Sequence, residues 1–108
     1  MNTKTPNNSE RVWVKNKVVH CGDDEYPISE LRRIVVQVSD LSFVKDTVRL
    51  YLDFGESALI IPSMHSSYDT LFEHLGKCVR IDDDAYLRAM NCDYTCDFVI
   101  FERKDKAK

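Results

Sequence analysis

The part of the sequence that most limits the possible folds is residues 47–61. It contains two runs of β-type residues, 47–53 and 57–61, on either side of the short connection 54–56, which reads Phe-Gly-Glu. Two such runs around a short glycine-containing connection are typical of a β-hairpin. We therefore predict a hairpin here and place the other elements relative to it.

The two strands of this hairpin carry different patterns. The first alternates, so it is predicted to turn apolar residues toward a core and to turn Arg49 and Tyr51 away from it. The second run, 57–61, is apolar at Ala58, Leu59, Ile60 and Ile61. A continuous apolar run predicts a strand covered on both faces.

The residues before the hairpin also favour strands. Val12, Val14 and Val19 belong to β-type runs, and Asn16-Lys17 either separates two short strands or kinks one longer strand. The run 32–39 is a strong strand pattern with apolar residues on alternate positions.

The pattern changes to helical periodicity after the hairpin. Apolar residues at Tyr68, Leu71, Phe72 and Leu75 predict an amphipathic helix over 68–75, with Gly76 at the C′ position. A second helix is predicted to begin at the acidic run 82–84 and to end at Asn91, because acidic residues suit a helix N-terminus. The apolar run 96–101 is expected to be a last strand.

These elements predict an α+β fold. We expect one antiparallel β-sheet of about five to six strands with two helices on one face, in the order β-β-β-β-β-α-α-β. The alternative is a curled barrel closed by a helix, similar to a pleckstrin-homology domain. Residues 1–10 are polar and are expected to form a disordered leader, 11–103 a single domain, and 104–108 a charged tail.

Composition adds expectations about location. No stretch has the apolar length of a transmembrane helix, and the N-terminus has no apolar secretion signal, so we expect a cytoplasmic protein without membrane contact. The four cysteines are then expected to be reduced thiols.

The charge is unevenly distributed. The chain carries a net charge of −3, residues 102–108 carry +2 and the first ten residues carry none, so the body 11–101 carries −5. An acidic body disfavours direct nucleic-acid binding and is compatible with a basic protein partner.

The sequence contains no strong catalytic or metal-binding motif. Cys92 and Cys96 have a spacing that zinc sites use, but His20 and Cys21 are adjacent in sequence and make a poor second ligand pair. Adjacent residues on a strand also point to opposite faces, so His20 cannot easily activate Cys21. We expect no enzyme activity, no metal and no cofactor.

Two acidic clusters are the main candidates for a binding site. They are Asp82, Asp83 and Asp84, and Asp23, Asp24 and Glu25. A helix cap and a turn explain them without any partner, whereas a docking patch for basic groups gives them a function. Tyr51 is a candidate aromatic anchor, with Arg49 beside it on the same predicted face.

Residues 17–101 resemble a group of small uncharacterised bacterial domains in organisation. The resemblance rests on the segment 26–36, YPISELRRIVV, followed by a strand hairpin and then by 67–75, SYDTLFEHL. A small, acidic, stand-alone chain of this kind also resembles the immunity proteins of bacterial toxin systems, including contact-dependent growth inhibition. That resemblance implies a monomer that binds and blocks a cognate toxin domain, often a nuclease. The alternative function is that of a pleckstrin-homology-like regulatory or interaction module.

Overall fold

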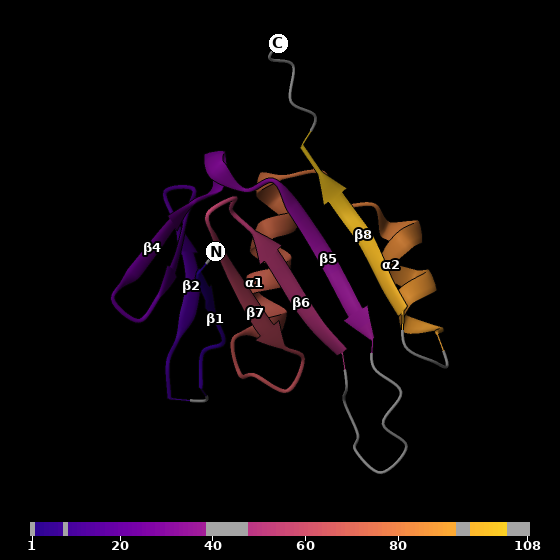
Figure 1. Cartoon of the computed structure of the whole chain (residues 1–108), viewed down its shortest axis with the longest axis horizontal. Coiled ribbons are helices and arrows are strands. Elements are labelled where there is room, and N and C mark those ends of the chain that lie inside the picture. The colour runs from indigo at the N-terminus through magenta and orange to yellow at the C-terminus, as the bar shows by residue number, and fades with distance from the viewer. Residues whose placement is uncertain (1, 8, 39–47, 93–95, 104–108) are drawn as a thin grey trace.

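The computed structural model describes residues 2–7, 9–38, 48–92 and 96–103. In these residues the chain forms eight β-strands, two α-helices and one short 3₁₀ helix, as Figure 1 shows. The predicted α+β class is therefore confirmed. The predicted tail 104–108 lies outside the described residues.

Five strands form the main sheet, in the order β1-β7-β6-β5-β8. Their bounds are β1 Asn2–Lys4, β5 Arg33–Val38, β6 Val48–Asp53, β7 Ser57–Pro62 and β8 Cys96–Glu102. All neighbours are antiparallel except β1 and β7, which are parallel. The ladder between β5 and β8 shifts register at Ile34/Val35, where β8 carries one extra residue, as in a β-bulge.

The central hairpin of this sheet is the one predicted from the sequence. β6 and β7 pair from Asp53↔Ala58 to Arg49↔Pro62. The turn between them closes with the Phe54 N–H donating to the Ser57 carbonyl at 2.8 Å. Gly55 has φ +92°, a conformation that side chains with a Cβ rarely adopt, and this explains the glycine in the connection.

A second sheet contains the three antiparallel strands β2 Val12–Lys15, β3 Val18–Cys21 and β4 Asp24–Pro27. Of the two readings of Asn16-Lys17, two short strands is correct. Both residues have positive φ, 54° and 61°, as a two-residue type I′ turn requires. The 3₁₀ helix η1, Ile28–Glu30, then leads to β5.

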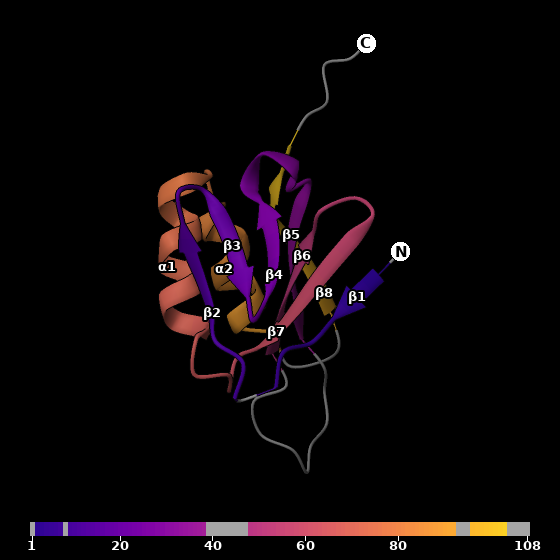
Figure 2. The ribbon, with the colours of Figure 1, turned by 90° about the vertical axis from the view of Figure 1, so that its left-hand side faces the viewer.

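Both helices pack on one face of the five-stranded sheet, as Figure 2 shows. Helix α1, Tyr68–Cys78, buries Tyr68, Leu71 and Leu75, which are three of the four residues of the predicted stripe. Helix α2, Asp83–Met90, runs between the predicted ends and has Asp82 as its N-cap and Asn91 as its C-cap. Gly76 lies inside α1, so its predicted C′ role is wrong.

The core lies between the helices and the five-stranded sheet and extends under the three-stranded sheet. Its fully buried members come from all of these layers; among them are Val12, Val19, Ile34, Val36, Leu50, Leu52, Leu59, Ile61, Leu71 and Leu75. The residues of β5, β6 and β7 in this list lie two positions apart on each strand, as the two-residue period of a strand requires for side chains on one face.

The fold differs from the predicted single antiparallel sheet. The strands form a mixed sheet and a separate antiparallel sheet, seven strands precede the helices, and the described strands do not close into a barrel. Pro27 and the turn of η1 separate β4 from β5. Strands β2 to β4 therefore pair with one another instead of continuing into the main sheet.

The N-terminal segment also differs from the prediction of a disordered leader. Asn2–Lys4 form β1, whose register with β7 is Asn2↔Ser57 to Lys4↔Leu59. The Lys4 ammonium pairs with Glu10 at 3.0 Å and with Asp24 at 3.1 Å. These pairs and the backbone ladder hold the segment at the sheet edge, and neither is visible in its polar composition.

A buried histidine attaches the next part of this segment to α1. His65 is 4% exposed; its Nε2 lies 2.9 Å from the Asn7 carbonyl, and its Nδ1 accepts from the Ser67 N–H at 3.0 Å. The Ser67 hydroxyl in turn accepts from the Val12 N–H at 3.1 Å. With Nδ1 as an acceptor, Nε2 is the nitrogen that donates to the Asn7 carbonyl, and these bonds join the start of α1 to β2.

Candidate functional site

The face of the five-stranded sheet turned away from α1 and α2 is the most prominent surface of the molecule. We call it the open face. Figures 1 and 2 show both helices on the other side, and no helix or sheet of the described residues lies over this one. Sheets in soluble proteins commonly leave one face to solvent, but that face is then expected to be polar.

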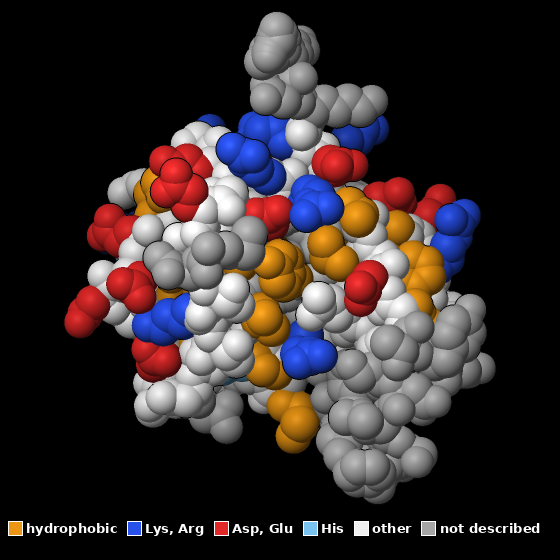
Figure 3. Space-filling model, in the orientation of Figure 1, with side chains coloured by type: hydrophobic (Ala, Val, Ile, Leu, Met, Phe, Trp, Pro, Cys, Tyr) orange, Lys and Arg blue, Asp and Glu red, His pale blue; other side chains and the backbone are white. Residues whose placement is uncertain are grey.

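Four apolar or aromatic residues cross the open face in one line. Their registers are Ile60↔Tyr51, Tyr51↔Val35 and Val35↔Val99, so the line spans β7, β6, β5 and β8. We call these four residues the apolar row. Val99 is 43% exposed, and the other three are half-buried by their neighbours. Figure 3 shows hydrophobic side chains gathered over these strands.

Polar residues lie on both sides of the apolar row. On one side the cross-strand registers join Arg49, Gln37 and Asp97, and on the other they join Asp53, Arg33 and Glu102. An apolar centre with a polar rim is the common anatomy of a protein-binding surface.

The rim contains one ion pair that is partly buried. Asp53 is 6% exposed, and its Oδ2 accepts from Arg33 Nη2 at 3.2 Å. Its Oδ1 accepts from the Gly55 N–H at 2.8 Å. Arg33 and the Gly55 N–H thus satisfy this buried carboxylate, and the ion pair directs the Arg33 guanidinium across the rim.

The predicted surface residues Tyr51 and Arg49 both lie on the open face, as expected from the alternation of their strand. The sequence reasoning missed the other members of the row. Ile60 was expected in a strand covered on both faces, but the helices cover only the side that carries Leu59 and Ile61. A valine or isoleucine at an outward position of several neighbouring strands could have indicated the apolar row. Recognising that these residues form one line requires the register of the strands.

The acidic run 82–84 lies beside the β8 edge of the open face. The Asp82 side chain accepts from the Ala85 N–H at 3.1 Å, so this residue acts as a helix cap. The Asp82 N–H donates to the Ile100 carbonyl of β8 at 2.7 Å. Asp83 and Asp84 are exposed in the first turn of α2. All three line an open depression of about 860 Å³ together with Val99 of the apolar row.

The other acidic cluster, 23–25, lies elsewhere. It occupies the turn between β3 and β4 and the start of β4, on the opposite side of the molecule from α2 in Figure 1. Asp24 pairs with Lys4, and Glu25 lies 3.8 Å from His20. The structure therefore does not bring the two acidic clusters together, and only 82–84 borders the open face.

The open face consequently has an acidic end. This end contains Asp97 and Glu102 of β8 and the run 82–84. Arg80 is the basic residue in the depression that residues 82–84 line. Arg33 and Arg49 lie on the inner strands β5 and β6. A docking partner would meet an apolar centre flanked on one side by concentrated negative charge.

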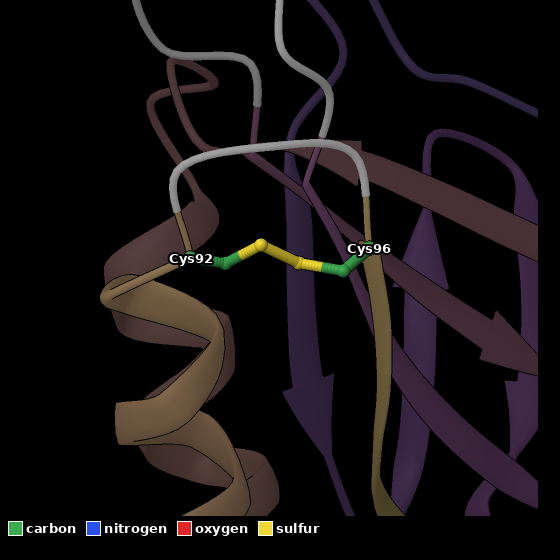
Figure 4. Close-up of a disulfide and its surroundings, with 2 residues drawn as sticks. All are labelled: Cys92 and Cys96. Atoms are coloured by element: carbon green, nitrogen blue, oxygen red, sulfur yellow. A yellow bond between two sulfur atoms is a disulfide. The ribbon is translucent and has the colours of Figure 1, made fainter.

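Two of the four cysteines differ from the expected reduced thiols, while Cys21 and Cys78 are free. Cys92 and Cys96 form a disulfide that connects the end of α2 to the start of β8, as Figure 4 shows. It removes the pair from consideration as zinc ligands in this state.

The remaining candidates for catalysis, Cys21, His20 and Cys78, do not form a reactive group. Cys21 is buried, and burial raises the pKa of its thiol, which favours the unreactive protonated form. His20 instead stacks on Trp13, with ring centroids 5.0 Å apart. Cys78 is exposed at the end of α1. Among the described residues no group of three His, Cys, Asp or Glu side chains is placed to hold a metal ion.

Comparison with known proteins found no relative of this chain. No protein-family model, curated protein or solved structure matches this chain. Within the described residues, none of the helices combines the length and the apolar content needed to cross a membrane.

Proposed function

We propose that this chain is an immunity-type protein that binds and neutralises a cognate bacterial toxin domain, with the open face as its docking surface. The immunity class rests on the resemblance described above. The observation that supports docking is the apolar row, because Val99 is exposed and Ile60, Tyr51 and Val35 are only half-buried, which leaves apolar area on this face that a partner can bury.

The charge of the face supports a basic partner. The carboxylates at the β8 end complement a positively charged surface, such as the active-site cleft of a nuclease. Complementary charge mainly raises the association rate and selects the partner, while buried aromatic and aliphatic anchors supply most of the affinity. In this proposal Tyr51 and Val35 are the anchors, and residues 82–84 steer the partner.

The experiment compares two matched valine variants. Val35→Asp places a charge in the apolar row, and Val18→Asp places the same charge on a half-buried strand position of the three-stranded sheet. Tagged wild-type and variant chains are used to capture proteins from the native cells. We expect one protein to be retained by the wild type and by Val18→Asp and to be lost with Val35→Asp.

The captured protein must then behave as a toxin. Expressed alone it should stop growth, and co-expression of the wild-type chain should restore growth while Val35→Asp should not. A captured protein that is harmless, or that binds Val35→Asp as tightly as the wild type, would contradict the proposal. Circular dichroism of both variants checks that they remain folded.

A further inference from the structure

A second feature, separate from the open face, lies where the two sheets meet. It is a cleft of about 520 Å³ between β4 and η1 on one side and the β6–β7 turn on the other. This volume lies within the range of about 300–1,000 Å³ that is common for small-molecule sites. The other lining groups come from Arg32 before β5 and Arg103 after β8, so the site needs segments that are far apart in sequence.

Arg103 is fixed in this cleft by backbone carbonyls. Its Nε donates to the Leu31 carbonyl at 2.9 Å and its Nη2 donates to the Ile28 carbonyl at 3.0 Å. Its guanidinium carbon also lies 5.8 Å from the centroid of the Phe101 ring. A guanidinium has five N–H donors, and these two bonds leave others for a ligand.

Arg32 lies against Gly55 of the β6–β7 turn. A Cβ at position 55 would lie 3.1 Å from Arg32 Nε, so the glycine leaves room for this guanidinium as well as for the turn. The backbone N–H of Arg32 donates to the Asp53 carbonyl at 2.7 Å, and its carbonyl accepts from the Arg103 N–H at 2.8 Å. The two arginines are therefore joined through the backbone at one end of the cleft.

Neither guanidinium has an anionic partner in the part of the chain that the structure describes. The ion pairs found there involve Lys4, His20 and Arg33 instead. Two arginines that face one cleft and make no ion pair with the described residues offer a site for the carboxylate of a ligand, because the planar fork of a guanidinium matches that group.

The rest of the cleft is suited to the other parts of such a ligand. Tyr26 and Phe54 form an aromatic wall, with ring centroids 5.1 Å apart. Glu30 and Glu56 are exposed lining residues that make no ion pair with the described residues, and Glu25 is a third carboxylate at the β4 side. A ligand that carried only negative charge would be repelled by these glutamates, whereas a ligand with an added positive group would not.

We infer that this cleft binds a small zwitterionic molecule of the α-amino-acid class with an apolar side chain. Its carboxylate contacts Arg32 and Arg103, its ammonium group faces the glutamates, and its side chain packs on Tyr26 and Phe54. This site is independent of the proposed docking of a toxin domain on the open face.

The experiment uses L-phenylalanine as the probe and the ¹H–¹⁵N NMR spectrum of the full chain as the readout. We expect saturable shifts in the millimolar range or below for amides that line the cleft, including Glu30, Arg32, Gly55 and Arg103. L-Phenylalaninamide lacks the carboxylate and N-acetyl-L-phenylalanine lacks the ammonium group, so each should bind roughly tenfold more weakly or not at all.

Matched arginine variants locate the carboxylate contact. Arg32→Gln should weaken L-phenylalanine binding by roughly tenfold, and Arg88→Gln, at an exposed arginine of α2, should leave it unchanged. The inference is overturned if L-phenylalanine causes no saturable shifts, if the shifts lie elsewhere, if the amide binds equally well, or if Arg32→Gln has no effect. Should Arg32→Gln fail to fold, the two ligand analogues still decide the matter on the wild-type chain.

Discussion

The two faces of the five-stranded sheet share the same strands and yet have opposite environments. On the covered face Leu50, Leu52, Leu59 and Ile61 are completely buried beneath the helices. On the open face, one residue away along each strand, the apolar row keeps contact with solvent. The comparison shows that hydrophobic alternation selects a core face, but apolar residues on the second face need a different explanation.

We propose that the apolar residues of the open face are explained by a binding partner. Burying apolar surface contributes roughly 25 cal/mol per Å², and the covered face gains this on folding while the open face would gain it only on association. Substitutions on the covered face should therefore change stability, and substitutions on the open face should change binding. The following predictions test this division, from the largest expected effect to the smallest.

The largest effect is expected for Leu52→Ala, which removes a fully buried side chain from the covered face. The free energy of unfolding should fall by about 2–5 kcal/mol, because both the transfer energy and a residual cavity contribute. Urea unfolding followed by circular dichroism measures this change. A loss below about 1 kcal/mol would mean that the helices do not pack on this face in solution.

A sharper comparison uses two neighbouring valines of β5 with identical substitutions. Val36→Thr puts a hydroxyl into the covered face, where Val36 is completely buried, and should cost about 1–3 kcal/mol. Val35→Thr changes the open face and should alter stability by less than about 0.5 kcal/mol. Equal losses in the two unfolding experiments would contradict the assignment of the faces.

An alkaline transition is expected from the tyrosine of the covering helix. Burial, and to a lesser degree the hydrogen bond with the Tyr86 hydroxyl, raises the pKa of Tyr68 well above its ordinary value of 10.0. The unfolded chain therefore ionises first, so this contribution to stability is complete below pH 10 and is lost as the pH rises further, by up to about 1.4 kcal/mol per pH unit. Tyr68→Phe should reduce this slope in unfolding experiments above about pH 10 and should leave the dependence below that pH unchanged.

The residues of the acidic run 82–84 are expected to differ in their effect on stability, because Asp82 caps α2 and Asp83 lies on its surface. Asp82→Ala should lower the free energy of unfolding by about 1 kcal/mol, because it removes the acceptor of the Ala85 N–H. Asp83→Ala removes only a charge near the helix N-terminus and should cost about 0.3–1 kcal/mol. If Asp82→Ala has no measurable effect on the melting temperature, the cap is not formed in solution.

The smallest effect is a gain in stability at Gly76 of the covering helix. Gly76 is exposed inside α1, and an added Cβ would meet its nearest atom, Cδ1 of Ile81, at an ordinary 3.8 Å. Gly76→Ala should therefore raise the free energy of unfolding by about 0.5–1 kcal/mol. A loss of stability would instead support the predicted C′ position at the end of a shorter helix.

Several elements were predictable because their signals are local. The hairpin around Gly55 follows from a turn that requires positive φ, and α1 follows from apolar residues repeating at helical spacing. The start of α2 at Asp82 follows from capping chemistry. Each of these depends on residues that lie within about one turn of one another in the sequence.

The missed features depend on distant contacts. The polar residues 2–4 form a strand only because the edge of β7 offers them a ladder and Glu10 and Asp24 hold Lys4. The apolar row requires the registers of three strand pairs, one of them involving β8, which follows both helices in the chain. The disulfide between Cys92 and Cys96 is an exception, because these residues are only four positions apart and reduced thiols were expected from the lack of a secretion signal.

The sequence by itself determined the α+β class, the central hairpin and the two helices, since periodicity and turn chemistry act over a few residues. The tertiary structure decided that the strands divide into two sheets, which face of the main sheet is covered, and which outward residues form one surface. Those outcomes depend on pairing between segments far apart in the chain, where the energy comes from packing and register that no local pattern encodes.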